Sequence, residues 1–142
     1  MSTRRSNLLS LGFMLALAGV PGSPLFAQAR TPAIDGYDPV AYFIDKRPVQ
    51  GQPNISYDWD DKRYLFANSK NRGLFAGDPD RYEPQFNGLC AGNVAKGNKV
   101  RADPTIWRVV DGKLYLFAGQ PSSDEAVARA VVVAQAKWKD LK

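Results

Sequence analysis

The sequence contains no histidine and a single cysteine, Cys90, among its 142 residues. There is therefore no imidazole to act as a general base and no second thiol for an internal disulfide. One cysteine without histidine also cannot complete a tetrahedral zinc site within one chain. Any thiolate or soft-metal chemistry must pass through Cys90, with further ligands from a partner or a second copy.

Long apolar runs are also scarce. The longest one, residues 8–20, is too short for a bilayer-spanning helix, which needs about 20 residues. Arg4 and Arg5 precede this run, and Ala27-Gln28-Ala29 follows it with the small-x-small pattern of a cleavage site. The sequence therefore predicts a cleaved signal peptide at residues 1–29.

Export implies a periplasmic or secreted protein without a stable membrane anchor, in which residues 30–142 form one domain. A retained N-terminal anchor is the alternative interpretation. The twin arginines resemble part of a twin-arginine signal, so the twin-arginine and general secretion routes both remain open.

The positive charge is modest, at +5 for the whole chain, and it falls further when Arg4 and Arg5 leave with the signal peptide. The remaining charges are spread along the chain, as on an ordinary solvated surface. We therefore expect no binding of nucleic acid.

Two β-hairpins are predicted by alternating apolar and polar residues. Residues 55–59 and 63–67 flank a charged turn, and residues 107–110 and 113–117 flank Asp111-Gly112. Asp-Gly favours the type I′ turn, which requires positive φ at both central positions. No internal repeat is apparent in the sequence.

Helices are predicted between and after the hairpins. Asp38-Pro39 favours a capped helical turn, Ser69 can cap a helix that ends near Gly77, and Asp78-Pro79 begins another turn. Ser122 and Glu125 form a capping-box pattern before a C-terminal amphipathic helix. Its apolar stripe consists of Val127, Ala130, Val131, Ala134 and Trp138. The expected fold class is a small single α+β domain with two β-hairpins, short helices and a C-terminal amphipathic helix.

Three blocks of residues occur in an order that resembles the YHS-domain family, in its exported single-domain branch. The family motifs are Asp38-Pro39-Val40, Tyr64-x-Phe66 and Phe75-x-x-Asp78-Pro79-x-x-Tyr82. The three blocks of the exported branch are residues 35–43, residues 82–91, which end in Gly88-x-Cys90-Ala91, and residues 107–115. The resemblance implies a small YHS-like α+β module. The metal-associated branch carries cysteines where this chain has Ala41, Ala67 and Asn71, so its metal site does not carry over.

Cys90 is the candidate thiol, because it lies between Gly88 and Gly92 and could begin a helix whose N-terminus raises its reactivity. A small buried residue under glycines is the alternative. Tyr37, Tyr42 and Phe86 are candidates for a ligand pocket, since they neighbour the turns that carry the resemblance. Packing in the core is the alternative interpretation for these aromatic residues.

No nucleophile–base pair or cofactor motif is found, so we do not expect an enzyme. The preferred hypothesis is a non-enzymatic module that binds a small-molecule ligand or a protein partner. The alternative is a metal or thiol-redox accessory protein that acts through Cys90, with a copper, zinc or iron ion shared with a partner. No metal site is expected in the monomer.

Overall fold

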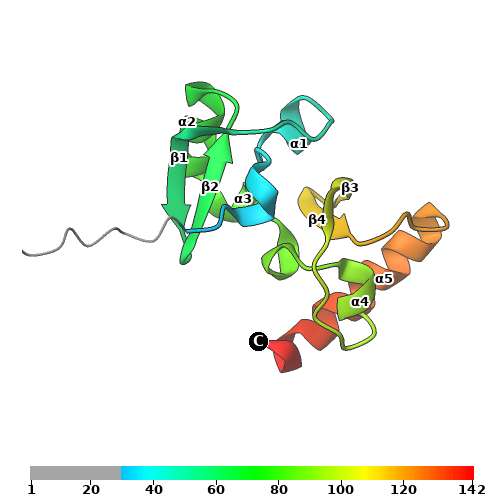
Figure 1. Ribbon diagram of the computed structural model, residues 1–142. Helices are drawn as coiled ribbons and strands as arrows, with labels where there is room; N and C mark the ends of the chain where they lie inside the picture. The colour runs from blue at the N-terminus through cyan, green and yellow to red at the C-terminus, as the bar shows by residue number, and fades with distance from the viewer. Residues whose placement is uncertain (1–29) are drawn as a thin grey trace, which may run out of the picture.

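A computed structural model describes residues 30–142 and shows an α+β fold built around two antiparallel hairpins (Figure 1). The predicted signal peptide, residues 1–29, lies outside the described residues. In chain order the elements are η1 (Ala33–Gly36), α1 (Ala41–Ile44), β1 (Gln52–Trp59), β2 (Lys62–Phe66), α2 (Ser69–Gly77), α3 (Pro79–Tyr82), η2 (Gln85–Gly88), α4 (Ala91–Val94), β3 (Asp103–Val110), β4 (Lys113–Phe117) and α5 (Asp124–Leu141).

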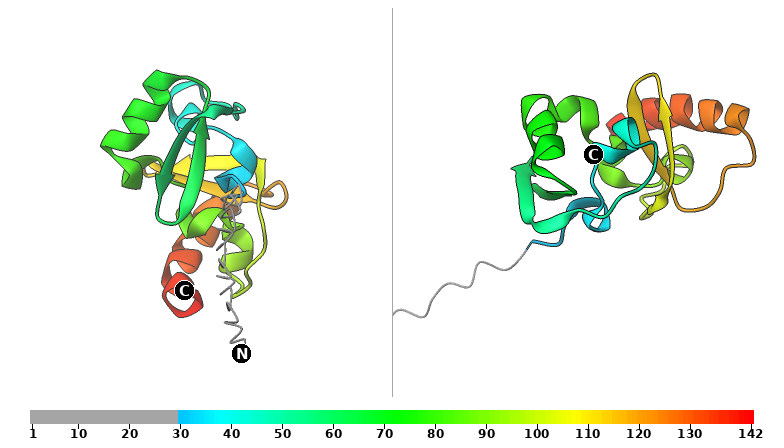
Figure 2. Two further views of the ribbon diagram at one scale, coloured as in Figure 1. Left: turned by 60° about the vertical axis from the view of Figure 1, so that its left-hand side comes forward. Right: turned by 90° about the horizontal axis from the view of Figure 1, so that it is seen from above.

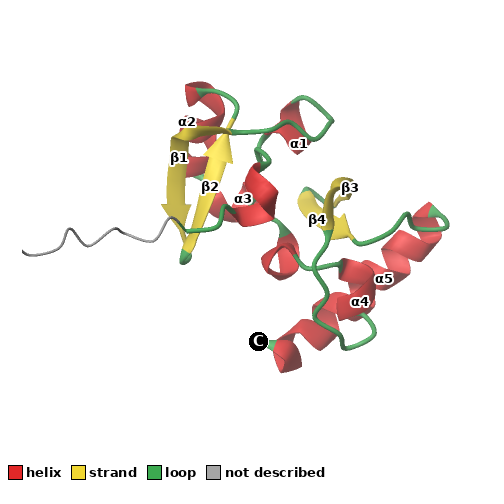
Figure 3. Ribbon diagram, in the orientation of Figure 1, coloured by secondary structure: helices red, strands yellow, loops and turns green. Residues whose placement is uncertain are grey.

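Both predicted hairpins are confirmed, with first strands that begin earlier than expected (Figure 3). β1 pairs with β2 and β3 pairs with β4, and each pair contains a bulge in its first strand. The bulge lets the strand continue past the alternating residues, which is why alternation alone located only its second part. Asp111 and Gly112 have φ of 49° and 73°, as a type I′ turn requires.

The helices are confirmed, but two N-caps lie one residue away from the prediction. Asn68, not Ser69, accepts a hydrogen bond from the Asn71 amide at the start of α2. Ser123, not Ser122, caps α5 by accepting from the Ala126 amide. In each case the capping residue has the extended backbone that an N-cap adopts. Within residues 30–142, none of the helices has the length and apolarity needed to cross a bilayer.

Residues 32–141 contain two segments in which the same types of element follow in the same order, although no repeat is apparent in their sequence. Residues 32–77 and 84–141 each contain a left-handed turn, a one-turn helix, a bulged hairpin and a closing helix, in that order. The halves form two lobes that lie side by side in Figure 1 and in the right-hand view of Figure 2. The repeat is one of backbone conformation, which different side chains can satisfy, and this explains why the residues alone did not reveal it.

The left-handed turns η1 and η2 show the similarity of the two halves most clearly. Ile34 and Asp35 have φ of 44° and 54°, and their counterparts Phe86 and Asn87 have φ of 57° and 56°. A glycine with positive φ ends each turn. Positive φ is rare for a β-branched or bulky residue, so two such residues at matching places are not a coincidence of loop geometry.

Backbone hydrogen bonds repeat as well. The amide of Tyr37 donates to Ile34, as the amide of Leu89 donates to Phe86. Each turn also begins with a parallel bridge to the second strand of its own half, Pro32 with Arg63 and Pro84 with Leu114.

Each half has its own hydrophobic core. The first contains Val40, Tyr64, Phe66, Phe75 and Tyr82, and the second contains the buried side chains of η2, α4, β4 and α5. Tyr42 of the first half is fully buried in the second core. Its hydroxyl donates to the Pro104 carbonyl at 2.8 Å, and its ring meets Trp107 edge-on at 5.3 Å. Tyr42 therefore joins the two halves.

Candidate functional site

The largest of three cavities described here lies where the two halves meet, and its volume is about 510 Å³. The β1–β2 turn of the first half contributes Asp60, and Glu83 comes from the connection between the halves. The remaining lining comes from Pro84, η2, the loop after α4 and the C-terminal end of the chain around α5. The lining residues are Asp60, Glu83, Pro84, Gln85, Phe86, Asn87, Lys99, Trp138 and Lys142. This volume lies within the range of small-molecule sites, about 300–1,000 Å³. We call it the junction cavity.

Aromatic side chains form one wall of the junction cavity. Phe86 is almost fully buried, and its ring lies 5.6 Å from Trp138 at an interplanar angle of 62°. On its other side Phe86 packs 5.7 Å from Tyr115 in β4. The left-handed backbone of η2 sets the position of Phe86, while α5 brings Trp138 from near the C-terminus. The wall therefore exists only when α5 is docked.

Glu83 is the half-buried acid of the junction cavity. Burial is the main cause that raises the pKa of its carboxyl, and the nearby Asp80 and Asp60 raise the pKa further. Lys62 and Lys113 act in the opposite direction. Within the described part of the chain, no cation lies close enough to Glu83 to form an ion pair, for which about 4 Å is the usual limit. Its charge is thus poorly compensated.

Asp60, the other acid of the cavity, is compensated. The ammonium group of Lys62 lies 3.4 Å from Asp60 Oδ2 and donates to Asn87 Oδ1 at 3.1 Å. This pair of contacts ties the first hairpin to η2 across the junction. Lys62 is therefore occupied with Asp60 and Asn87, and Glu83 remains available to a ligand.

Lys99 and Lys142 are the two cations that line the junction cavity. Both are exposed, and neither forms an ion pair with another residue of the described range 30–142. Lys99 lies in the loop between α4 and β3, and Lys142 follows α5. The lining therefore combines a half-buried acid with two exposed lysines.

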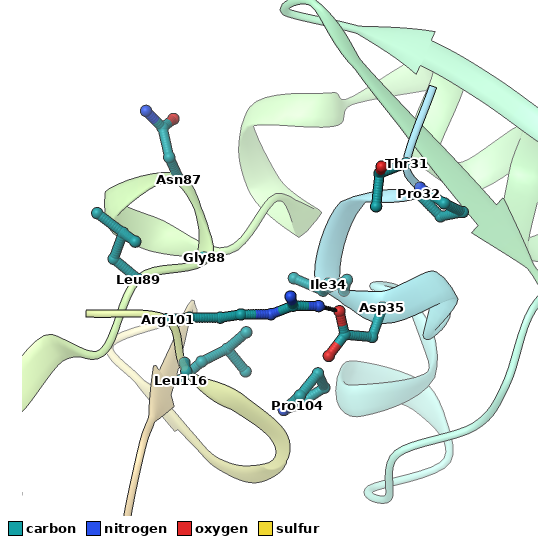
Figure 4. A pocket seen from close by; sticks show the side chains of 11 residues that line it. Thr31, Pro32, Ile34, Asp35, Asn87, Gly88, Leu89, Arg101, Pro104 and Leu116 are labelled. Carbon is teal, nitrogen blue, oxygen red and sulfur yellow. Dashed lines mark hydrogen bonds and ion pairs between the residues drawn. The ribbon is translucent and has the colours of Figure 1, made fainter. Parts of the chain in front are cut away.

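A second, smaller cavity of about 190 Å³ lies between the two left-handed turns (Figure 4). Figure 4 shows Arg101 extending across it to form an ion pair with Asp35 of η1. Ile34 and Gly88 approach each other so closely here that a Cβ on Gly88 would lie 3.1 Å from the Ile34 side chain. The two charges of this cavity satisfy each other, and its volume is below that of most ligand sites.

Cys90 borders a third cavity of about 420 Å³, with Asn93 and Phe117 among its neighbours. The thiol is 4% exposed, and its sulfur accepts a hydrogen bond from Asn93 Nδ2 at 3.2 Å. Cys90 does precede a helix, as expected, but α4 is a single turn. The structure therefore places the thiol at the edge of the second core.

The three aromatic candidates from the sequence do not come together in one pocket. Phe86 lines the junction cavity, whereas Tyr42 is a core residue and Tyr37 packs half-buried against the second core. For Tyr37 and Tyr42 the alternative interpretation, packing in the core, describes their positions. Burial raises the pKa of the Tyr42 hydroxyl far above its usual range, and nearby Tyr37, Asp103 and Asp38 add to the effect.

Sequence reasoning missed Glu83 and Trp138. Glu83 gave no signal, because a single acid between Tyr82 and Pro84 fits an ordinary loop. Trp138 was assigned to the apolar stripe of α5, and it does belong to that stripe. In the structure its ring is only partly buried.

Among residues 30–142, no three carboxylates or thiols gather closely enough to hold a metal ion. Comparison of the chain with protein-family models, curated proteins and solved structures found no match.

Proposed function

We propose that this protein is an exported, non-enzymatic YHS-like module that binds a small molecule in the junction cavity. One observation carries the proposal: a cavity of about 510 Å³ has an aromatic wall of Phe86 and Trp138 and a half-buried acid, Glu83, that forms no ion pair with any residue of the described range 30–142. Sites for small molecules combine apolar walls with polar groups that fix orientation. The lining here is more polar than apolar, and Phe86 and Trp138 supply its aromatic part. The predicted signal peptide supports the export.

The lining supports binding rather than catalysis. It contributes no hydroxyl or thiol nucleophile, and the chain has no histidine to serve as a base. Cys90 borders a different cavity. Nucleophilic catalysis requires a nucleophile and a base within hydrogen-bond reach. Within residues 30–142, no side-chain hydrogen bond joins two of the carboxylates and amines of the lining, since Asp60 contacts Lys62.

A thiol or metal accessory role through Cys90 is the second candidate. The observation in its favour is the 420 Å³ cavity beside the sulfur, which could admit a group from a partner. Copper, zinc or iron would then need its other ligands from that partner, since soft-metal sites use several such donors.

One experiment tests both candidates. The protein is isolated as naturally exported, without refolding, and its bound small molecules and metals are identified by native mass spectrometry and elemental analysis. We expect a bound organic molecule that is lost in Trp138→Leu and retained in Cys90→Ala. A stoichiometric metal that disappears in Cys90→Ala would replace the first proposal with the second. A preparation of Trp138→Leu that carries the same molecules as the parent would remove the junction cavity from consideration.

A further inference from the structure

We propose that the ligand of the junction cavity is a small zwitterionic amine of about the size of a free amino acid. The inference rests on the proposed function and adds to it the chemical class of the ligand. It follows from the charges of the lining, in which the acid Glu83 is half-buried and the lysines Lys99 and Lys142 are exposed.

The half-buried Glu83 favours a cationic group on the ligand. Glu83 is half-buried and lacks an ion-pair partner within residues 30–142, while Asp60 is already paired with Lys62. An organic ammonium would donate hydrogen bonds to the Glu83 carboxylate, and its positive charge would be favoured over the indole face of Trp138. Binding would thereby offset the free-energy cost of keeping the Glu83 carboxylate half-buried in the unliganded protein.

A hard metal cation fits the same place poorly. Calcium takes six to eight oxygen ligands. Within residues 30–142, Glu83 is the one side-chain carboxylate of the lining that forms no ion pair, because Asp60 and the Asn87 side-chain oxygen both engage Lys62. An organic cation needs one carboxylate and an aromatic face, which the cavity has.

The exposed lysines of the lining favour an anionic group on the ligand. Lys99 and Lys142 are exposed and their side chains are free of ion pairs within the described range, so a carboxylate that contacts either ammonium group would gain a charge-assisted hydrogen bond. A simple amine would satisfy Glu83 and leave both lysines facing its neutral end. A simple carboxylate would satisfy the lysines and leave Glu83 uncompensated. A molecule with both charges satisfies all three residues.

The rest of the lining accepts an apolar group. Phe86, Trp138 and Pro84 present ring surfaces, and the volume of about 510 Å³ exceeds what the two charged ends of an amino acid occupy. Amino acids with an aromatic or aliphatic side chain therefore fit better than glycine. The other two cavities lack this combination, since the charges of the smaller one pair with each other.

Three matched probes test the inference: L-phenylalanine, phenethylamine and 3-phenylpropanoate. They share one ring and chain length and carry both charges, the positive charge alone, and the negative charge alone. Binding is followed by calorimetry and by amide chemical shifts on the mature protein, residues 30–142, at low ionic strength. We expect L-phenylalanine to bind at least tenfold more tightly than either singly charged probe, a difference of about 1.4 kcal/mol. Equal affinity for the three probes, or no binding of any of them, would overturn the inference.

Variants assign each charge to its partner. We expect Glu83→Gln to weaken L-phenylalanine and phenethylamine about tenfold and to leave 3-phenylpropanoate unchanged. Lys99→Gln should weaken L-phenylalanine and 3-phenylpropanoate, with phenethylamine unchanged. Asp140→Asn and Lys96→Gln are matched controls, because both residues are exposed and lie outside the lining. Charge variants that bind like their controls would contradict the assignment.

The outcomes separate this inference from the proposed function. A naturally bound molecule that is lost in Trp138→Leu but carries only one charge, or none, would overturn the zwitterion and preserve the binding module. Probe binding that is insensitive to Trp138→Leu would overturn both.

Discussion

Asp38 and Cys90 occupy equivalent positions in the two halves of the molecule. Each follows a left-handed turn and precedes a one-turn helix, and their amides donate to Val49 and Val100 at 2.8 and 2.9 Å. Their side chains differ completely. The buried Asp38 carboxylate accepts four hydrogen bonds, whereas the Cys90 thiol meets Asn93 and borders a cavity. In the first half this position is thus filled by the hydrogen bonds of Asp38, whereas in the second half a cavity adjoins the corresponding residue, Cys90.

Asp38→Ala should strongly destabilise the protein. The carboxylate accepts from the amides of Val40, Ala41 and Ala67 and from Asn71 Nδ2, at 2.8–3.3 Å. Hydrogen bonds to charged groups contribute about 1.5–3 kcal/mol each, and buried donors left unmatched add a cost. We therefore expect a loss of at least about 3 kcal/mol in urea unfolding, against less than about 0.5 kcal/mol for the exposed control Asp140→Ala. A loss below about 1 kcal/mol would contradict the role assigned to Asp38.

Cys90 should be protected from thiol reagents in the folded protein. Its side chain is 4% exposed, so we expect rapid labelling only after denaturation. Cys90→Ala removes one atom beside an existing cavity and should cost about 1 kcal/mol. Labelling of the native protein at the rate of a free thiol would show that the adjoining cavity opens to the sulfur, and would favour the accessory role.

Tyr42→Phe should weaken the connection between the halves. It leaves the Pro104 carbonyl without its 2.8 Å donor while keeping the ring against Trp107. A lost neutral hydrogen bond at a buried site costs about 1–2 kcal/mol. Tyr37→Phe, which alters a half-buried hydroxyl, is the matched control. Equal stabilities of the two variants would contradict the linking role of Tyr42.

Alkaline pH should unfold the protein through its buried tyrosines. Burial raises the pKa of Tyr42 and of Tyr64 well above the ordinary value near 10, because folding favours their neutral form. The stability from this preference is therefore present below about pH 10 and is lost as the pH rises above it. Ultraviolet absorbance should show two tyrosines that ionise only with unfolding. Ionisation of every tyrosine near pH 10 in the native protein would contradict this.

Glu83→Gln should stabilise the unliganded protein at neutral pH. Burial, opposed by Lys62 and Lys113 and reinforced by Asp80 and Asp60, raises the pKa of Glu83 in the folded state. The folded state therefore holds this proton more tightly than the unfolded chain, and stability falls as the pH rises through the unfolded value of 4.5 to the raised folded value. Glutamine removes that loss.

The measurement for Glu83 is the melting temperature at pH 4 and pH 7, with Asp140→Asn as the control. The gain of Glu83→Gln over the parent should be larger at pH 7. A lower melting temperature at pH 7 would show that Glu83 already has a compensating partner. A stabilising change that also weakens ligand binding is typical of a functional residue.

Local features of the fold could be read from the sequence. Asp111-Gly112 predicts its turn because few residues tolerate positive φ, and the apolar spacing of α5 predicts which face is buried. The N-caps of α2 and α5 were each misplaced by one residue, since Ser69 and Ser122 have a capping neighbour of equal suitability.

The similarity of the two halves and the junction cavity could not be read in this way. Ile34 and Phe86 share a left-handed backbone, but their side chains differ. Their equivalence is therefore visible in backbone dihedral angles and hydrogen bonds and not in the sequence. Glu83 and Trp138 are far apart in the chain and come to line one cavity when α5 docks onto the second core.

By itself, the sequence determined the kind of chemistry that is open to this protein and the type of most elements, because composition, turn geometry and apolar spacing act locally. The tertiary structure alone decided which charges remain uncompensated. Burial and pairing depend on residues that are distant in the chain, and this is why Glu83 became the acid of a cavity while Asp60, Lys62 and Asn87 satisfied one another.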